Sequence, residues 1–328
     1  MNGSRPVRLS AFLLRRLWQA VPLVFGVLVI TFTLVHVAPG DPITFLAGDG
    51  GNAAYSREMR AHYGLDRSIP EQLVRYILSV LSGDFGYSFN YQQPVINIIL
   101  SRLPATLLLM GTALVLSTVF GLLLGLVAAT HSNRLLDHLI TAFTSTAFAM
   151  PVFWLGQLLV LGLAVQLNLF PVQGMISVRE EYTGLRQWLD ILHHLALPAL
   201  TLSLSYLALI ARLSRTSLRE ALNEEYITTA RAKGLSSRVV VGRHALRNAL
   251  LPIITVTGGH LGLMLTGAAL TETIFAWPGL GRLLLDATLN RDYPLLMAIF
   301  IMVSITVVLA NLLTDLTYGL LDPRVRYA

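Results

Sequence analysis

Histidine is the residue type in this chain that could bind a metal or transfer a proton near neutral pH, and the 328-residue sequence has eight of them. His193 and His194 are adjacent, so on a helix their rings point in different directions. We therefore expect both to be solvated rather than to ligate one metal ion. His260 differs from this pair because it is flanked by glycines within a long apolar stretch.

Sequence motifs of hydrolytic enzymes do not occur. There is no HExxH, no GxSxG and no Cys, so zinc-protease, serine-hydrolase, disulfide and thiolate-metal chemistry have no residues to use. A phosphate-binding loop needs Gly-Lys-Ser/Thr, but the one lysine, Lys233, stands between Ala and Gly. We predict no catalytic, cofactor-binding or metal-binding residues, and we expect any ATP hydrolysis to occur on another polypeptide.

The composition is that of a membrane protein. Hydrophobic residues make up 54% of the chain and charged residues 13%, against roughly 25% charged in soluble domains. The net charge of +6 could suggest a nucleic-acid partner. In an apolar chain it is explained more simply by the basic loops on one side of a membrane, so we predict lipid and no nucleic acid as surroundings.

Six stretches without Asp, Glu, Lys or Arg reach the length of about 20 residues that a membrane-spanning helix needs. We expect Pro151 to kink the third stretch, and we interpret the first as a retained anchor rather than a signal peptide. The six are Leu17–Ala38, Leu103–Thr130, Leu139–Phe170, Ile191–Ala211, Asn248–Thr271 and Tyr293–Thr314. The predicted fold is an all-α integral membrane protein with six transmembrane helices.

The termini and the second and fourth connections of this topology differ strongly in charge from the remaining connections. Segments 1–16, 131–138, 212–247 and 319–328 carry 15 of the 24 basic residues and five acidic ones. By the positive-inside rule these segments, and therefore both termini, are cytoplasmic. The organisation we predict is a cytoplasmic N-terminus 1–16, a first helix 17–38, an external loop subdomain 39–102, a five-helix core 103–318 that includes the cytoplasmic segment 212–247, and a cytoplasmic C-terminus 319–328.

Two features concern the external side. Pro70 and Glu71 begin a segment whose apolar residues Leu73, Ile77, Val80 and Leu81 predict an amphipathic helix against the outer surface. Glu272 comes at the outer end of the fifth span, where we expect it to be exposed at the membrane interface.

Polar and small residues inside the spans indicate helix contacts or a pathway. His260 falls in the middle of the fifth span, at a depth where polar groups face a bundle interior or a water-filled path. Lining of a transport pathway and a simple hydrogen bond between helices both fit it. The pairs Gly121/Gly125 and Gly258/Gly262 have the spacing of close helix packing.

The stretch EEYITTARAKGL, 224–235, is a polar helix-like run in the apolar chain. Asn223 is a candidate N-cap, acidic residues occupy the first turn, Arg231 and Lys233 the last, and Gly234 is placed to end the helix. A helix of about ten residues is marginal in water unless tertiary contacts hold it. Tyr226, Thr229, Ala230 and Lys233 share one face, which fits either an ordinary cytoplasmic connection or a helix that docks in a groove on another protein.

This segment, followed by RHALRNALLP at 243–252, resembles the conserved cytoplasmic segment of inner-membrane permease subunits of bacterial ABC importers. The resemblance is to the dipeptide, oligopeptide and nickel branch, and within it to the B-type subunit of dipeptide permeases. Two departures from the general importer signature, Thr228–Thr229–Ala230 in place of Glu-Ala-Ala and a longer distance from Gly234 to Pro252, look typical of this branch. The motifs in order are PGDP at 39–42, GDFGYS at 83–88, RLPATL at 102–107, ETIFAWPGLGRLLLDA at 272–287, RDYP at 291–294 and DPRVR at 322–326.

The resemblance implies a bacterial inner-membrane permease that forms the translocation path with a sister permease. Two ABC ATPase subunits would hold ATP and Mg, and an external binding protein would deliver the substrate. The segment would be the coupling helix that docks on an ATPase, through Glu224, Glu225, Tyr226, Thr229, Ala230, Arg231, Ala232, Lys233 and Gly234.

Di- or oligopeptides are the expected substrates, with nickel or a metal chelate as the alternative. A secondary transporter or channel is the alternative of another class. Such proteins generally carry charged residues within their spans, whereas the six stretches, by the way they were chosen, contain no Asp, Glu, Lys or Arg.

Overall fold

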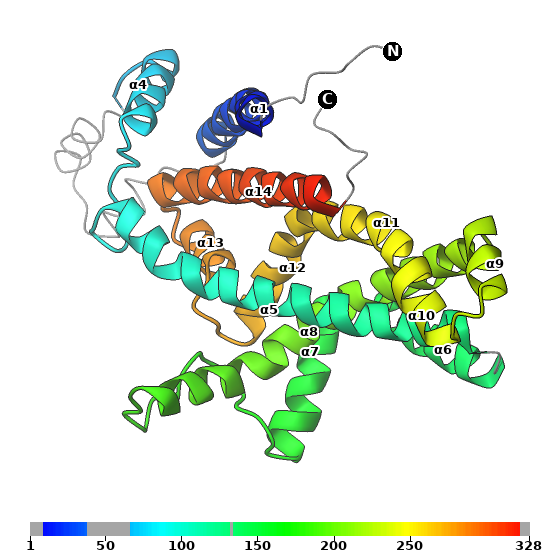
Figure 1. The fold of residues 1–328 in the computed structure, drawn as a ribbon. Coiled ribbons are helices and arrows are strands. Elements are labelled where there is room, and N and C mark those ends of the chain that lie inside the picture. The colour runs from blue at the N-terminus through cyan, green and yellow to red at the C-terminus, as the bar shows by residue number, and fades with distance from the viewer. Residues whose placement is uncertain (1–8, 38–65, 132–133, 322–328) are drawn as a thin grey trace, which may run out of the picture.

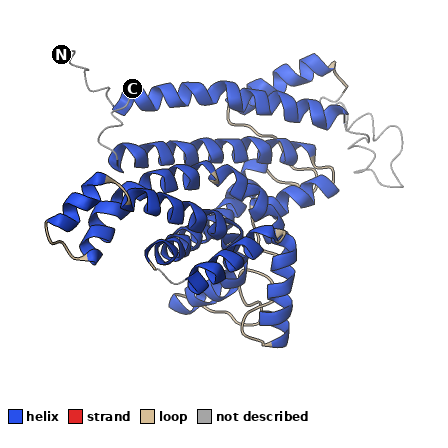
Figure 2. Ribbon diagram, turned by 90° about the vertical axis from the view of Figure 1, so that its right-hand side faces the viewer, coloured by secondary structure: helices blue, strands red, loops and turns tan. Residues whose placement is uncertain are grey.

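The computed structural model describes residues 9–37, 66–131 and 134–321, and its regular elements in these ranges are helices, as the all-α prediction expects (Figures 1 and 2). In chain order they are α1 (Leu9–Val37), α4 (Ile69–Leu81), α5 (Val95–Thr130), α6 (Arg134–Ala149), α7 (Val152–Leu159), the π-helix η2 (Val160–Gln166), α8 (Leu185–Leu222), α9 (Glu225–Ala232), α10 (Ser237–Val239), the π-helix η3 (Val240–Ala245), α11 (Leu246–Gly259), α12 (Leu261–Ile274), α13 (Leu280–Leu289) and α14 (Tyr293–Leu321). The motifs at 39–42 and 322–326 lie outside the described residues.

Membrane spans can be assigned from helix length and apolar character. Within the described ranges five helices qualify, and a bent pair, Leu135–Ala149 with Val152–Gln166, makes up to six if it counts as one span. The five are Leu14–Val37, Val95–Thr130, Leu185–Leu222, Ser237–Gly259 and Tyr293–Leu316. The multi-span helical architecture is confirmed, whereas two of the predicted spans are not single helices.

The third predicted span is broken rather than kinked. Its two halves, α6 and α7 with η2, meet at an angle of 107°. Pro151 lies at the break with an extended backbone (ψ 136°) and begins α7. A proline lacks the N–H that would continue α6 and disfavours a helical conformation in the residue before it, so the chain restarts in a new direction.

The fifth predicted span is interrupted at His260, between α11 and α12. Gly258 is required there by packing, because a Cβ at this position would lie 1.9 Å from Cγ2 of Thr314 in α14. Two successive glycines also lower helix stability by roughly 1 kcal/mol each relative to alanine, which favours an interruption at this point. Helix α5 differs from its predicted span in another way, since it begins at Val95, directly after Pro94.

The close pairing of α5 with α8 forms the centre of the fold (Figure 1). A Cβ at Gly121 would lie 2.9 Å from Ile210, and one at Gly125 only 2.4 Å from Cβ of Ser214. The close helix packing predicted from the Gly121/Gly125 pair therefore occurs between two helices of this chain. Around this crossing a buried core includes Leu109, Leu195, Leu202, Met264 and Trp277.

Helices α1 and α14 pack beside each other at the edge of the molecule (Figure 2). A salt bridge of 3.0 Å between Arg16 and Asp315 joins the beginning of α1 to the last third of α14. The two ends of the described chain therefore lie on the same side of the helix bundle. Helix α4 and helix α9 lie at opposite ends of the molecule (Figure 1).

Candidate functional site

Helix α9 is the helix predicted from the polar stretch, and it begins one residue later than expected. Asn223 was the candidate N-cap, but it is the C-cap of α8, and its N–H donates to the Glu220 carbonyl at 3.0 Å. Glu224 takes the N-cap position with an extended backbone (ψ 149°) and makes no side-chain cap bond. The assignment to Asn223 is wrong because α8 continues to Leu222, well past its apolar stretch.

The end of α9 agrees with the prediction. Gly234 has a positive φ of 76°, a conformation that glycine adopts without steric cost. Its N–H donates to the Arg231 carbonyl at 2.9 Å, and the next N–H, of Leu235, reaches the Ala230 carbonyl at 3.4 Å. These bonds satisfy carbonyls that the helix end would leave open.

One face of α9 is part of the protein's own core. Ile227 and Ala230 are 1% and 5% exposed, and they pack with Leu218, Ala221, Val240, Ala245 and Ala249 of α8, η3 and α11. The sequence grouped Ala230 with an outward face, and this is corrected: spacing on one helix cannot tell which side neighbouring helices will cover. The other predicted docking residues are exposed, namely Glu224, Glu225, Tyr226, Thr229, Arg231, Ala232, Lys233 and Gly234.

An ion-pair cluster connects α5, α6 and α8. The Asp137 carboxylate in α6 accepts a hydrogen bond from the Arg215 guanidinium of α8, and Arg219 lies 3.7 Å from the same oxygen. Arg219 also donates to the Ala128 carbonyl near the end of α5 at 3.2 Å. Sequence reasoning did not single out this cluster, although two arginines four residues apart on one helix face were a visible signal.

His260 bonds within its own helix rather than across to another. Its Nδ1 lies 2.7 Å from the Val256 carbonyl, which can only accept, so Nδ1 carries the proton. The ring stands edge-on to Tyr206, with centroids 6.3 Å apart. A cavity with room for about one water molecule lies beside them, lined also by Leu114, Ser117, Leu209, Ile210, Val256, Thr257 and Met264. Pathway lining by His260 stays a prediction.

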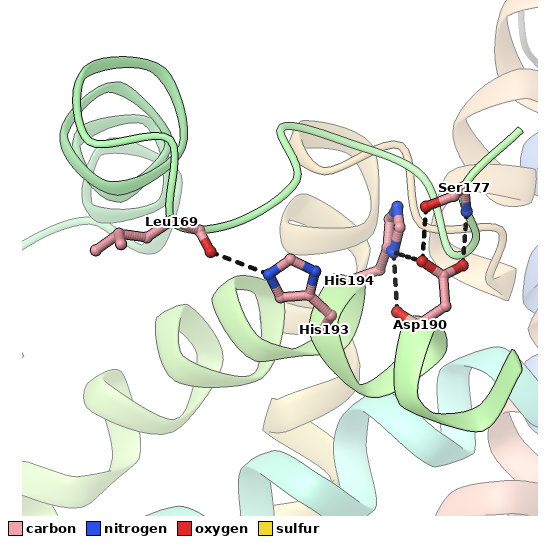
Figure 3. A network of polar contacts seen from close by, with 5 residues as sticks. All are labelled: Leu169, Ser177, Asp190, His193 and His194. Atoms are coloured by element: carbon pink, nitrogen blue, oxygen red, sulfur yellow. Dashed lines mark hydrogen bonds and ion pairs between the residues drawn. The ribbon is translucent and has the colours of Figure 1, made fainter. Parts of the chain in front are cut away.

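The adjacent histidines hold the connection between η2 and α8 (Figure 3). Nε2 of His193 lies 3.0 Å from the Leu169 carbonyl, whereas Nδ1 of His194 faces Asp190, 2.9 Å from its carbonyl and 3.4 Å from its carboxylate. That carboxylate accepts bonds from the N–H and the hydroxyl of Ser177 at 2.7 and 2.6 Å. Solvation was expected for both rings; His193 is exposed, but His194 is buried, because the returning connection covers it.

Glu272 is fully buried, and the expectation of interfacial exposure is wrong. Its carboxylate accepts bonds from the Thr106 hydroxyl at 2.6 Å and from the N–H groups of Gly281 and Arg282 at 2.7 and 3.1 Å. These N–H groups belong to the first turn of α13, where a negative charge is stabilised by the helix dipole. Gly279 passes so close that a Cβ there would lie 2.1 Å from the carboxylate.

The same contacts bring two distant motifs together. Thr106, in RLPATL, also accepts the Leu280 N–H at 2.8 Å, and the Trp277 indole donates to the Ala105 carbonyl at 2.8 Å. Thr106 and Glu272 are separated by 166 residues, so the turn after α12 is fixed onto α5 through buried bonds. The sequence offered one signal for this contact, the acidic residue five positions before the tryptophan of the Trp-Pro-Gly turn.

Asp292 anchors the next turn in a similar way. It is fully buried, accepts a hydrogen bond from the Ser88 hydroxyl and another from the Asn90 N–H at 3.1 Å, and begins α14. The motifs GDFGYS and RDYP thus meet at the end of α13. Helix α13 is held at both ends by buried carboxylates that sequence reasoning did not predict.

Two known protein families match this chain, one over each half. Residues 121–327 match the family described as "Binding-protein-dependent transport system inner membrane component". Residues 9–110 match the corresponding N-terminal family, "Binding-prot-dependent transport system membrane comp, N-term".

Individual relatives agree over almost the whole chain. The dipeptide transport system permease protein DppB of Escherichia coli (strain K12) is 40% identical over 334 residues, 96% of this chain and 98% of that protein. The oligopeptide transport system permease protein AppB of Bacillus subtilis (strain 168) is 35% identical over 320 residues, covering 97% of this chain and 100% of the relative.

A solved structure gives the same fold. An inward-facing MetNI methionine ABC transporter has a TM-score of 0.54 at 16% identity, over 69% of this chain and 97% of that one. With the matches to both family halves and to full-length relatives, this chain belongs to the inner membrane components of binding-protein-dependent transport systems.

Proposed function

We propose that this chain is the permease subunit of an ATP-driven importer for di- or oligopeptides. The observation that carries the proposal is the 40% identity, over nearly the full length of both chains, to a dipeptide permease. The di/tripeptide transport system permease protein DppB of Pseudomonas aeruginosa (strain UCBPP-PA14), 39% identical over 332 residues, 97% of this chain and 99% of that protein, supports the same substrate class. Nickel and metal chelates are not favoured by these relatives.

The permease acts with other subunits in this proposal. A sister permease completes the translocation path, two ATPase subunits bind ATP and Mg, and a binding protein delivers peptide on the external side. The family description, which names a binding-protein-dependent system, supports this set of partners. In this proposal the chain itself catalyses no reaction. During transport its helices switch as rigid bodies between two packings.

Helix α9 is the surface through which an ATPase would move this chain. Its exposed residues Tyr226, Thr229 and Lys233 face away from the bundle, while Ile227 and Ala230 fix it to α8 and η3. A force on the exposed face is therefore transmitted through a buried contact rather than through a flexible connection. The Asp137–Arg215 contact couples α6 to the same part of α8.

The proposed orientation has both termini and α9 in the cytoplasm. The excess of basic residues on these segments supports it. The Arg16–Asp315 salt bridge between α1 and α14 supports only that both termini lie on the same side. The location is the cytoplasmic membrane of a bacterium, with α4, α13 and their connections on the external side.

The test is ATP-dependent uptake into vesicles that contain the chain, its sister permease and its ATPases, with the binding protein added outside. We expect radiolabelled dipeptide to accumulate only when ATP and the binding protein are both present, and Ni²⁺ not to accumulate. Uptake by the chain alone without ATP would instead identify a secondary transporter or channel. Accumulation of Ni²⁺ but not of peptide would overturn the substrate class alone.

A further inference from the structure

Helix α4 has an apolar surface that no described part of the protein covers. We call Val74, Leu78 and Leu81 the outer stripe, because they are 55%, 61% and 78% exposed and recur at helical spacing. None of the residues of α4 is buried, although the helix is rich in large apolar side chains. An exposed stripe of this kind on a helix of a membrane protein indicates a surrounding that is not water.

The side of α4 opposite the outer stripe contacts α1. Tyr76 stacks on Phe32 with ring centroids 6.1 Å apart, and the side-chain amide oxygen Oε1 of Gln72 lies 3.0 Å from Nε2 of His36. Positions 72 and 76 are each two residues from a member of the outer stripe, and two residues correspond to about 200° around a helix. The outer stripe therefore points away from α1.

These two contacts also set the depth of α4. Phe32 lies six residues before Ala38, the end of the predicted first span, which corresponds to about 9 Å along a helix. Interfacial helices bury their apolar face about 5–10 Å below the headgroup boundary. The middle of α4 is thus beside the outer part of a membrane span rather than above the bilayer.

The neighbouring surface of α1 is apolar as well. Ile30, Leu34 and Val37 at the outer end of α1 are 59%, 63% and 76% exposed, and only 17% of an 18-residue window of the α1 span is buried within the protein. Ile30 and Leu34 are each two residues from Phe32, so this apolar surface of α1 points away from α4, and the two helices present apolar side chains on opposite outer faces of the pair. Glu71, Arg75 and Ser79 form the polar flank of α4 and give the helix one side suited to water and headgroups.

We propose that α4 is an interfacial helix whose outer stripe lies among the acyl chains of the outer leaflet. The helix then ties the external segment after α1 to the bilayer, and its polar flank faces the external solution. The occupant of the outer stripe is lipid, not the binding protein and not the sister permease.

The sequence has no cysteine, so single cysteines can be introduced without first removing native ones. We would label V74C, L78C and L81C with an environment-sensitive fluorophore, and E71C, R75C and S79C on the polar flank as matched controls. The labelled chain is reconstituted with its sister permease and ATPases in lipid vesicles. Quenching is measured with a lipid nitroxide near the headgroup and with iodide in water.

We expect the outer-stripe labels to be quenched by the lipid nitroxide at least about twofold more than the controls, and by iodide less. Stripe labels that iodide reaches as well as the controls would show that α4 stands in water and would overturn the proposal. Labels shielded from both quenchers would show a protein cover and would overturn it too.

A second measurement needs no substitution. A phospholipid with a photoactivatable group near the headgroup end of its acyl chain is added to the same vesicles, and the labelled peptides are identified by mass spectrometry. The peptide that contains the outer stripe should carry the adduct. Its absence, with adducts present on the outer end of α1, would contradict the lipid contact independently of how the cysteine variants fold.

Discussion

Glu272 and Asp292 are two acidic residues whose burial follows from contacts far away in the sequence. Each accepts hydrogen bonds from at least one backbone N–H at the beginning of a helix and from a hydroxyl of another segment, Thr106 in one case and Ser88 in the other. Buried charges are tolerated when they are paired or fully hydrogen-bonded. Sequence alone could not identify them, because an acid at a span end is usually exposed and its partners lie on other helices.

Replacing Glu272 by alanine should destabilise the protein strongly. The change leaves the Thr106 hydroxyl and two backbone N–H groups buried without an acceptor, and each loss of this kind costs about 1–3 kcal/mol. We expect a clear fall of the apparent melting temperature in detergent, and a smaller fall for Glu272→Gln, which keeps one acceptor oxygen. Glu220→Ala, at an exposed position of α8, is the control and should leave melting unchanged. Equal melting of E272A and E220A would rule out the anchoring role.

At the scale of elements, the sequence predicted spans better than breaks. Apolar length identifies α1, α5, α8 and α14 because the bilayer requires it. The effect of Pro151 could be a kink or a complete break, and the outcome, a bend of 107°, depends on how the two halves pack on the rest of the bundle. The same holds for α9. Its length and its end could be predicted from the sequence, whereas its buried face depends on how α8 and η3 pack against it.

Alanine substitutions at two glycines of α5 should have opposite effects on stability, because only one of the two glycines lies at the crossing with α8. Gly125→Ala places a Cβ 2.4 Å from Cβ of Ser214 and 2.7 Å from the Ala211 carbonyl, so the helices must separate. Overpacking of this kind costs about 1–3 kcal/mol. Gly111→Ala meets no atom within 4 Å and should stabilise α5 by up to about 1 kcal/mol.

The apparent melting temperatures of both variants, measured in one detergent, test whether the two substitutions change stability in opposite directions. G125A should melt below the unsubstituted protein and G111A at or above it. Similar decreases in melting temperature for both variants would mean that these glycines are needed for a reason other than the close packing of α5 on α8.

On the scale of the whole molecule, the structure separates two ends, which the proposed orientation places on the external and the cytoplasmic side. Helix α13 and its two carboxylate anchors connect the beginnings of α5 and α14, while α9 and the Asp137 cluster lie at the other end of α8 (Figure 1). The long helices α5 and α8 join the two ends through the tight glycine crossing. In the proposed importer, a displacement at α9 therefore reaches the external end through packed helices.

The docking role of α9 gives the final prediction, and the burial of Ala230 determines which residue tests it. Ala230→Asp would place a charge in the chain's own core, so it should lower the melting temperature whether or not an ATPase docks there. Tyr226→Ala removes an aromatic ring that is 37% exposed on α9 and leaves the core intact. Because tyrosine is often a dominant contact at interfaces, we expect ATPase binding to weaken about tenfold with melting unchanged. Tyr182→Ala is a matched control, since Tyr182 is also 37% exposed but precedes α8, at the end that the proposed orientation places outside. If Y226A binds the ATPase and couples hydrolysis to peptide uptake as well as Y182A does, the ATPase docks elsewhere on the cytoplasmic face.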